Sequence, residues 1–148
     1  MLIRPFEAKD QIPAKELIQA GLREYFGFID ETLNPDLDDI ALSFNDGCFL
    51  VGEIDSQLAA TGGYKPLNDS TVKIERVSVH SKFRRLGLAS QILNALVSEA
   101  KKAGYKRIVL ETTSDWNQAI EFWLKNGFRV THVEDSGAWS ETWFERQI

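Results

Sequence analysis

Cysteine, histidine and long hydrophobic runs are scarce in this chain of 148 residues. Its one cysteine cannot form an internal disulfide, and its two histidines lack paired ligand spacing, so we expect no metal site. A charge, glycine or asparagine interrupts every apolar run well before the roughly 18 residues that a membrane helix requires. The opening residues, MLIRPFEAKD, also lack a basic and apolar leader. We therefore expect a cytoplasmic protein with no membrane span.

Basic residues are also in the minority, with 17 Lys and Arg against 22 Asp and Glu and a net charge of -5. That balance argues against a broad polyphosphate-binding surface, so we expect no nucleic-acid partner. The length fits one domain over residues 1–148, and 43% of the residues are hydrophobic. A chain of this size buries roughly 68–70% of the surface that its unfolded form exposes.

The first half of the chain predicts a strand, a helix and a three-strand meander. Residues 2–6 are β-prone, and residues 8–22 carry helix formers. The predicted apolar face of that helix comprises Ile12, Leu17 and Ile18. A two-residue turn joins the β-prone runs 48–54 and 57–64 into a hairpin. In the third run, 71–79, alternation predicts one face with Glu75, Val77 and Val79 and another with Ile74, Arg76 and Ser78.

The second half predicts two more helices and three strands. Residues 87–103 repeat apolar side chains at helical spacing, and the buried-type strand 106–111 follows, which suggests a parallel crossover. A helix over 113–125, capped by Ser114 or Asp115, would carry Trp116, Ala119, Ile120 and Trp123 on one face. Strands at 128–134 and 138–147 complete the chain. Trp139 and Trp143 alternate on one face of the last strand, which suits packing in the core or in a dimer.

The segment RRLGLA, residues 84–89, follows one predicted strand and opens a predicted helix. Unpaired amides and the helix dipole favour an anion there, and Gly87 lets the backbone approach it closely. Lys82, Arg84 and Arg85 add positive charge. The segment therefore predicts a phosphate site. The alternative is that these six residues form an ordinary helix start with solvated arginines.

Arg84, Gly87 and Ala89 fill the pattern Gln/Arg-x-x-Gly-x-Gly/Ala, and the chain thereby resembles the Gcn5-related N-acetyltransferase (GNAT) family. IERVSVHSKF resembles the strand and loop before that motif, and WNQAIEFWLKNGF resembles the second cofactor motif. The order of elements agrees over almost the whole chain. The resemblance implies an α/β fold with a mixed sheet of about seven strands, splayed between the fourth and fifth, and about four flanking helices.

The same resemblance implies acetyl-coenzyme A as donor and a primary amine as acceptor. The pyrophosphate would lie on the amides of Arg85, Leu86, Gly87, Leu88, Ala89 and Ser90. The pantetheine arm carries two amides, so it can bond a splayed strand edge as another strand would. It would lie along Val77, Ser78 and Val79, with the Val79 amide donating to the thioester oxygen.

An alkyl amine of pKa about 10.4 is almost fully protonated at pH 7, and removing its proton costs about 4.6 kcal/mol. Glu75 stands near a position where family members often carry glutamate, so the resemblance implies that it serves as base, directly or through a water. The alternative is a carboxylate at the strand edge that pairs with Lys73 or Arg107.

Trp123 departs from the family pattern, because many members place a tyrosine general acid there and an indole N–H cannot serve as one. Either solvent or another group protonates the thiolate, with Tyr25 and Tyr64 as substitutes, or Trp123 shapes the acetyl pocket. Asn117, displaced by one residue, resembles the asparagine that contacts the pantetheine; helix capping is its alternative role.

The acidic segment DETLNPDLDD, residues 30–39, falls where the family's variable acceptor-side helices lie. Charge attraction would favour a cationic small molecule, an amino-acid derivative or a peptide amine, although ordinary surface charge explains the segment equally well. Family members are often dimers, so the resemblance also allows a homodimer. Trp123 motivates a second hypothesis, a regulatory module that binds acyl-coenzyme A with little or no transfer. A dinucleotide-binding fold is excluded because no G-x-G-x-x-G follows a strand.

Overall fold

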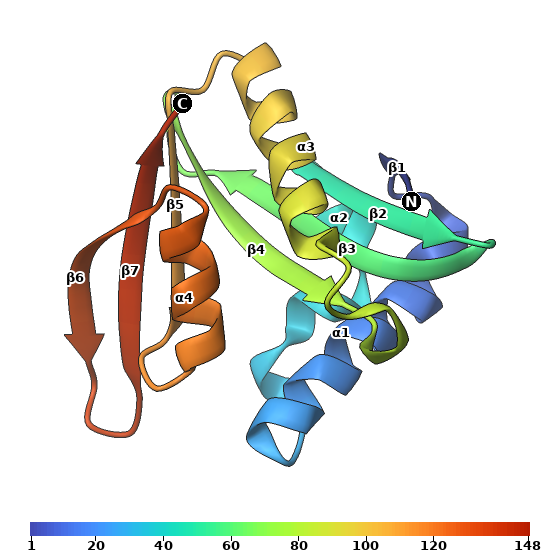
Figure 1. Ribbon diagram of the computed structural model, residues 1–148, viewed down its shortest axis with the longest axis horizontal. Helices are drawn as coiled ribbons and strands as arrows, with labels where there is room; N and C mark the ends of the chain where they lie inside the picture. Colours follow the sequence, from blue (N-terminus) through green and yellow to red (C-terminus); the bar gives the residue numbers. More distant parts are fainter.

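One mixed sheet of seven strands, in the order β1-β2-β3-β4-β5-β7-β6, forms the centre of the computed structural model, which describes residues 1–148 (Figure 1). The strands are β1 (Leu2–Pro5), β2 (Cys48–Ile54), β3 (Gln57–Pro66), β4 (Thr71–Val79), β5 (Arg107–Thr113), β6 (Arg129–Asp135) and β7 (Ser140–Gln147). The helices are α1 (Gln11–Phe26), α2 (Ile40–Ser43), α3 (Leu88–Lys102) and α4 (Asn117–Lys125). The predicted fold class is confirmed. No helix is both long and apolar enough to cross a bilayer.

The sheet opens between its fourth and fifth strands. β4 and β5 are parallel, but they pair only from Thr71 to Lys73 on β4 and from Arg107 to Val109 on β5. Beyond that point the two strands diverge, as Figure 1 shows. Residues 74–79 of β4 therefore have no strand beside them on this side, and the predicted splay is confirmed.

A bulge in β4 overturns the predicted alternation of its faces. The register of β3 against β4 shifts between Thr61 and Gly63, and Arg76 has a φ of 59°. The extra residue places Ile74 on the same face as Val77 and Val79, packed against the buried cluster under α3. A strict period of two predicted Glu75 on the face of Val77 and Val79. The bulge places Glu75 on the other face.

Two buried clusters hold the helices on opposite faces of the sheet. The larger cluster lies beneath α3 and α4, and the smaller one beneath α1 and α2. All six predicted apolar residues of α3 are buried: Leu88, Ile92, Leu93, Leu96, Val97 and Ala100. In α1, Leu17 and Ile18 are buried as predicted, but Ile12 is 69% exposed and Ala14 is buried instead. α1 also runs four residues beyond the predicted end, so its last turn carries Glu24, Tyr25 and Phe26.

The segment between β5 and α4 is longer than expected. α4 begins at Asn117, and neither predicted cap forms, because the residue before the helix is Trp116 and makes no side-chain cap. Trp116 instead stacks on Tyr25, with ring centroids 4.1 Å apart. Trp139 and Trp143 lie outside both buried clusters, so the first predicted alternative, packing in the core, is wrong, and packing in a dimer stays a prediction.

Candidate functional site

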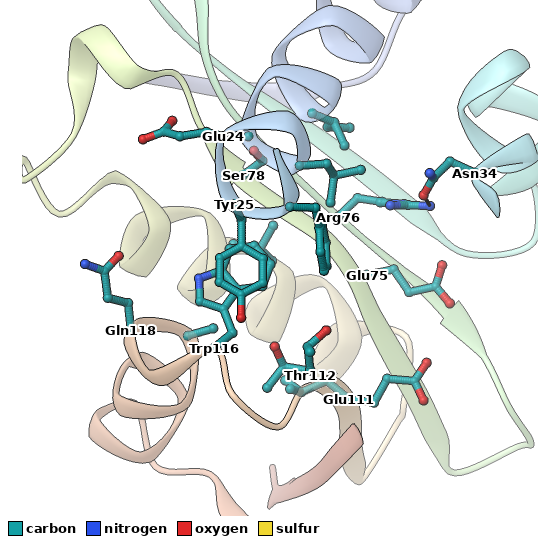
Figure 2. A pocket seen from close by; sticks show the side chains of 18 of the residues that line it. Glu24, Tyr25, Asn34, Glu75, Arg76, Ser78, Glu111, Thr112, Trp116 and Gln118 are labelled. Atoms are coloured by element: carbon teal, nitrogen blue, oxygen red, sulfur yellow. Dashed lines mark hydrogen bonds between the residues drawn. The ribbon is translucent and has the colours of Figure 1, made fainter. Parts of the chain in front are cut away.

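A cleft of about 840 Å³ opens where β4 and β5 part (Figure 2). Its walls come from both strands, the last turns of α1, the start of α4 and the segment that leads into β7. The volume lies within the range of roughly 300–1,000 Å³ that small-molecule sites occupy. The splay of the sheet therefore produces a cavity large enough to bind a ligand.

The predicted site residues fall into two groups. Those that line the cleft are Glu75, Val77, Ser78, Val79, Arg84, Ala89 and Trp123. Those that do not are Arg85, Leu86, Gly87, Leu88, Ser90 and Asn117. All but Asn117 in the second group lie between or beside Arg84 and Ala89, so their loop borders one end of the cleft. For Asn117, the neighbouring Gln118 lines the cleft instead, and the predicted capping role is not seen.

The open edge of β4 directs a backbone donor into the cleft. The amide of His80 donates to the carbonyl of Ala59 at 2.8 Å, which turns the His80 amide toward β3. Because successive residues of a strand direct their amides to opposite edges, the amide of Val79 faces away from β3. It therefore lies on the side from which β5 has diverged.

The loop before α3 is shaped by two residues in left-handed conformation, Arg85 with φ 64° and Gly87 with φ 76°. A side chain on Gly87 would meet no atom within 4 Å, so its surroundings are open. The first amides of α3 have no acceptor within the helix, and the Leu88 side chain is buried in the core while its amide stays at the loop. Such a nest of free amides is suited to an anion.

The Arg84 guanidinium is not free for that anion, because it forms two hydrogen bonds of 2.6 Å with the carboxylate of Glu24 on α1. This pair connects the loop to the helix that forms the opposite wall of the cleft. The arginine of the motif therefore acts as a tether in this structure.

Glu75 lies beside two lysines. Its carboxylate oxygens are 3.5 Å from Lys65 Nζ and 3.6 Å from Lys73 Nζ, and its side chain is 24% exposed. The predicted pairing with Lys73 is confirmed, but Arg107 pairs with Glu145 instead. Figure 2 shows Glu75 and Glu111 extending toward the same side of the cleft.

Glu141, at the start of β7, also lines the cleft, and the sequence did not indicate it. Burial raises the pKa of its carboxyl, and the neighbouring Glu111 raises it further, whereas Lys73 opposes the shift. Only the pairing of β7 with β5 brings these two acids together, and no motif marks that register.

The two tyrosines named as substitutes for an acid have different surroundings. Tyr64 is buried in the larger cluster and does not line the cleft. Tyr25 does line it, but its hydroxyl donates to Asp115 at 2.7 Å, and burial together with Asp115 raises its pKa. Trp123 is buried and contributes to the cleft wall.

Most acids of segment 30–39 form hydrogen bonds or ion pairs with other groups of the chain. Asp30 and Asp39 cap backbone amides of short helical turns, and Asp38 pairs with Lys15 at 2.7 Å. Asp36 accepts two hydrogen bonds, of 2.8 and 2.7 Å, from the guanidinium of Arg76 at the β4 bulge. These contacts engage four of the segment's five acids within the chain, which favours a structural role for them, and attraction of a cationic acceptor stays a prediction.

Cys48 is half-buried outside the cleft, and burial together with Glu99 raises the pKa of its thiol to about 11. At pH 8 only about one thiol in a thousand is ionised at that pKa. We expect a chromogenic disulfide reagent to titrate far less than one thiol per native chain, and one thiol per chain in denaturant. Rapid stoichiometric reaction of the native protein would contradict this burial.

Comparisons with known proteins agree with this architecture. The Acetyltransferase (GNAT) family model matches residues 14–128. N-acetyltransferase 8 of Homo sapiens is 28% identical over 112 residues, covering 70% of this chain and 49% of that protein. The chain spans about half the length of the curated relatives it matches.

Two solved structures share the fold over nearly the whole chain. A GNAT acetyltransferase from Staphylococcus aureus Mu50 has a TM-score of 0.88 at 21% identity, over 99% of this chain and 98% of that one. The PaiA N-acetyltransferase of Thermoplasma acidophilum, solved in complex with coenzyme A, has a TM-score of 0.82 at 18% identity, with the same two coverages.

Proposed function

Because this chain belongs to the GNAT acetyltransferase family, we propose that it transfers an acetyl group from acetyl-coenzyme A to a primary amine by direct attack. One observation carries the proposal: the unpaired edge of β4 and the amide-rich loop before α3 border the same cleft. A strand edge suits an amide-containing arm, and a helix start suits a pyrophosphate.

The residues present fit this donor along its length. Val77 and Val79 offer backbone groups on the open side of β4, and the free amides of residues 85–90 would hold the pyrophosphate. The coenzyme A complex of the Thermoplasma acidophilum protein, which has the same fold, supports this assignment. Lys82 and Arg85 supply positive charge nearby, whereas Arg84 is engaged by Glu24.

Bound acetyl-coenzyme A supplies an acetyl group activated as a thioester. Glu75 takes the proton that the attacking amine loses, directly or through a water, and Lys65 and Lys73 offset its negative charge. The amide of Val79 donates to the thioester oxygen as negative charge develops there. A new C–N bond forms, the C–S bond breaks, and the thiolate takes its proton from water.

Trp123 is compatible with this chemistry. A thiol of pKa about 8.5 leaves readily without a protein acid, so the cleft needs no tyrosine at this position. Trp123 would instead shape the wall against the acetyl group, since it is buried and lines the cleft.

A panel of primary amines tests the proposal. We expect release of free coenzyme A to match, one for one, the acetylated amine detected by mass spectrometry. Tight binding of coenzyme A without transfer to any amine would overturn it and favour a regulatory module that only binds acyl-coenzyme A, the role that Trp123 in place of tyrosine also suits.

A further inference from the structure

We propose that the cleft selects an aryl-alkyl monoamine, with Glu141 pairing with its ammonium group as it binds, before Glu75 takes the proton, and with aromatic side chains of the wall packing against its ring. This inference rests on the proposed function, because it names the class of amine that the cleft would present for transfer. It follows from the partners of the cleft carboxylates and from the surroundings of Glu141, which has neither a basic group nor a backbone amide as partner.

Most acids of the cleft already have partners. The five acidic residues that line it are Glu24, Asp30, Glu75, Glu111 and Glu141. The first is paired with Arg84, the second caps the amide of Thr32, and the next two share Lys73. Glu141 has neither a basic group within 4 Å nor a backbone amide as partner, and the group beside it is another carboxyl, that of Glu111. A carboxylate in that position gains most from a cation that enters with the ligand.

The surroundings of Glu141 are aromatic. Trp139 lies two residues before it, lines the same cleft and is 47% exposed. Phe26 meets Trp139 edge to face at 5.8 Å, and the stacked pair of Tyr25 and Trp116 continues the wall, as Figure 2 shows for these two rings. An exposed tryptophan over an apolar floor favours a flat hydrophobic group, which buries more area there than an aliphatic chain.

The charge count separates this ligand from a polycation. Glu141 is the one cleft carboxyl held neither by a basic group nor by a backbone amide, and the acids of segment 30–39 are mostly engaged within the chain. A polyamine would bring several ammonium groups to the cleft. Glu141 could pair with one of them, and the remaining ammonium groups would lie against aromatic surface without a carboxylate. The cleft therefore favours a ligand with one ammonium group and one aromatic ring.

The charged groups around Glu141 set the pH dependence of this pairing. Glu111 faces it from β5, Glu134 from β6 and Lys73 from β4, and burial with the two acids raises its pKa. Below that pKa the carboxyl is neutral, so affinity for the ammonium should fall as pH falls through it. The Glu141→Gln variant should lose this dependence.

Calorimetry on the full chain saturated with coenzyme A tests the inference without turnover. The probes are 2-phenylethylamine, n-butylamine, spermidine and 2-phenylethanol. We expect 2-phenylethylamine to bind at least about tenfold more tightly than each of the others, since each lacks the ring, the single charge or the ammonium. Glu141→Gln and Trp139→Ala should each weaken it about tenfold, while Glu121→Gln, at an exposed position on α4 outside the cleft, should change it little. Unchanged affinity for coenzyme A and unchanged Tm would establish that the variants fold.

Equal or tighter binding of spermidine or n-butylamine would overturn the inference, as would the absence of amine binding or no effect of Glu141→Gln. The proposed function fails separately. If 2-phenylethylamine binds as expected but is never acetylated, transfer is wrong and the selectivity stands; if spermidine is acetylated preferentially, transfer stands and the selectivity is wrong.

Discussion

Replacing Glu75 by glutamine lowers kcat/KM for the amine by about 100- to 10,000-fold, the range that loss of a general base produces. The amide keeps the shape of the side chain but cannot take the proton of the amine. The loss is largest at low pH, where unassisted free amine is rarest, and shrinks as pH approaches the pKa of the amine, about 10.4. Initial rates of thiol release between pH 6.5 and 9.5 provide the measurement.

A matched control separates catalysis from charge and folding. Glu121→Gln removes one carboxylate from an exposed position on α4 outside the cleft, and should leave the pH profile unchanged. Coenzyme A affinity should be the same in both variants. If the Glu75→Gln variant has the pH profile of the wild type, Glu75 is not the base and only forms ion pairs with Lys65 and Lys73.

The substitution Ala89→Asp should weaken coenzyme A binding by about 100-fold. Ala89 lies in the first turn of α3 and lines the cleft, so the new carboxylate would stand where the pyrophosphate is proposed to bind. Two like charges about 4 Å apart repel by about 4 kcal/mol at an effective dielectric of 20, and salt reduces this. The helix itself should be stabilised by about 0.3–1 kcal/mol, because an acid suits its N-terminus. Equilibrium titration with coenzyme A and a thermal melt together measure both effects.

Asn94→Asp is the matched control, since it adds the same charge to an exposed position on the same helix. It should leave coenzyme A affinity within about twofold of wild type, because a surface charge is screened beyond roughly 10 Å. If Ala89→Asp binds coenzyme A as tightly as this control, the pyrophosphate does not occupy the start of α3.

Local patterns in the sequence were enough to predict most elements. The helical spacing in α3 identified all six of its buried residues, because an amphipathic helix repeats over four turns. The two-residue turn at Asp55 and Ser56 identified the β2–β3 hairpin. The splay between β4 and β5 came from the family resemblance, since no residue in either strand marks where pairing stops.

Features that depend on distant contacts were not predictable. The bulge at Arg76 is a non-glycine residue at positive φ, held by Asp36 from forty positions earlier. Trp116 matched a helical face by spacing, but its stacking on Tyr25 depends on where α1 ends. Glu141 joins the cleft only through the register of β7 on β5. Each error therefore traces to a contact that links separate elements.

A crystal structure of the protein grown with coenzyme A would show whether the gap between β4 and β5 holds the donor. We expect the pantetheine amides to bond to the open edge of β4 at Val77 and Val79, and the pyrophosphate to lie on the amides of residues 85–90. Coenzyme A bound elsewhere on the molecule, with the edge of β4 uncovered, would contradict it.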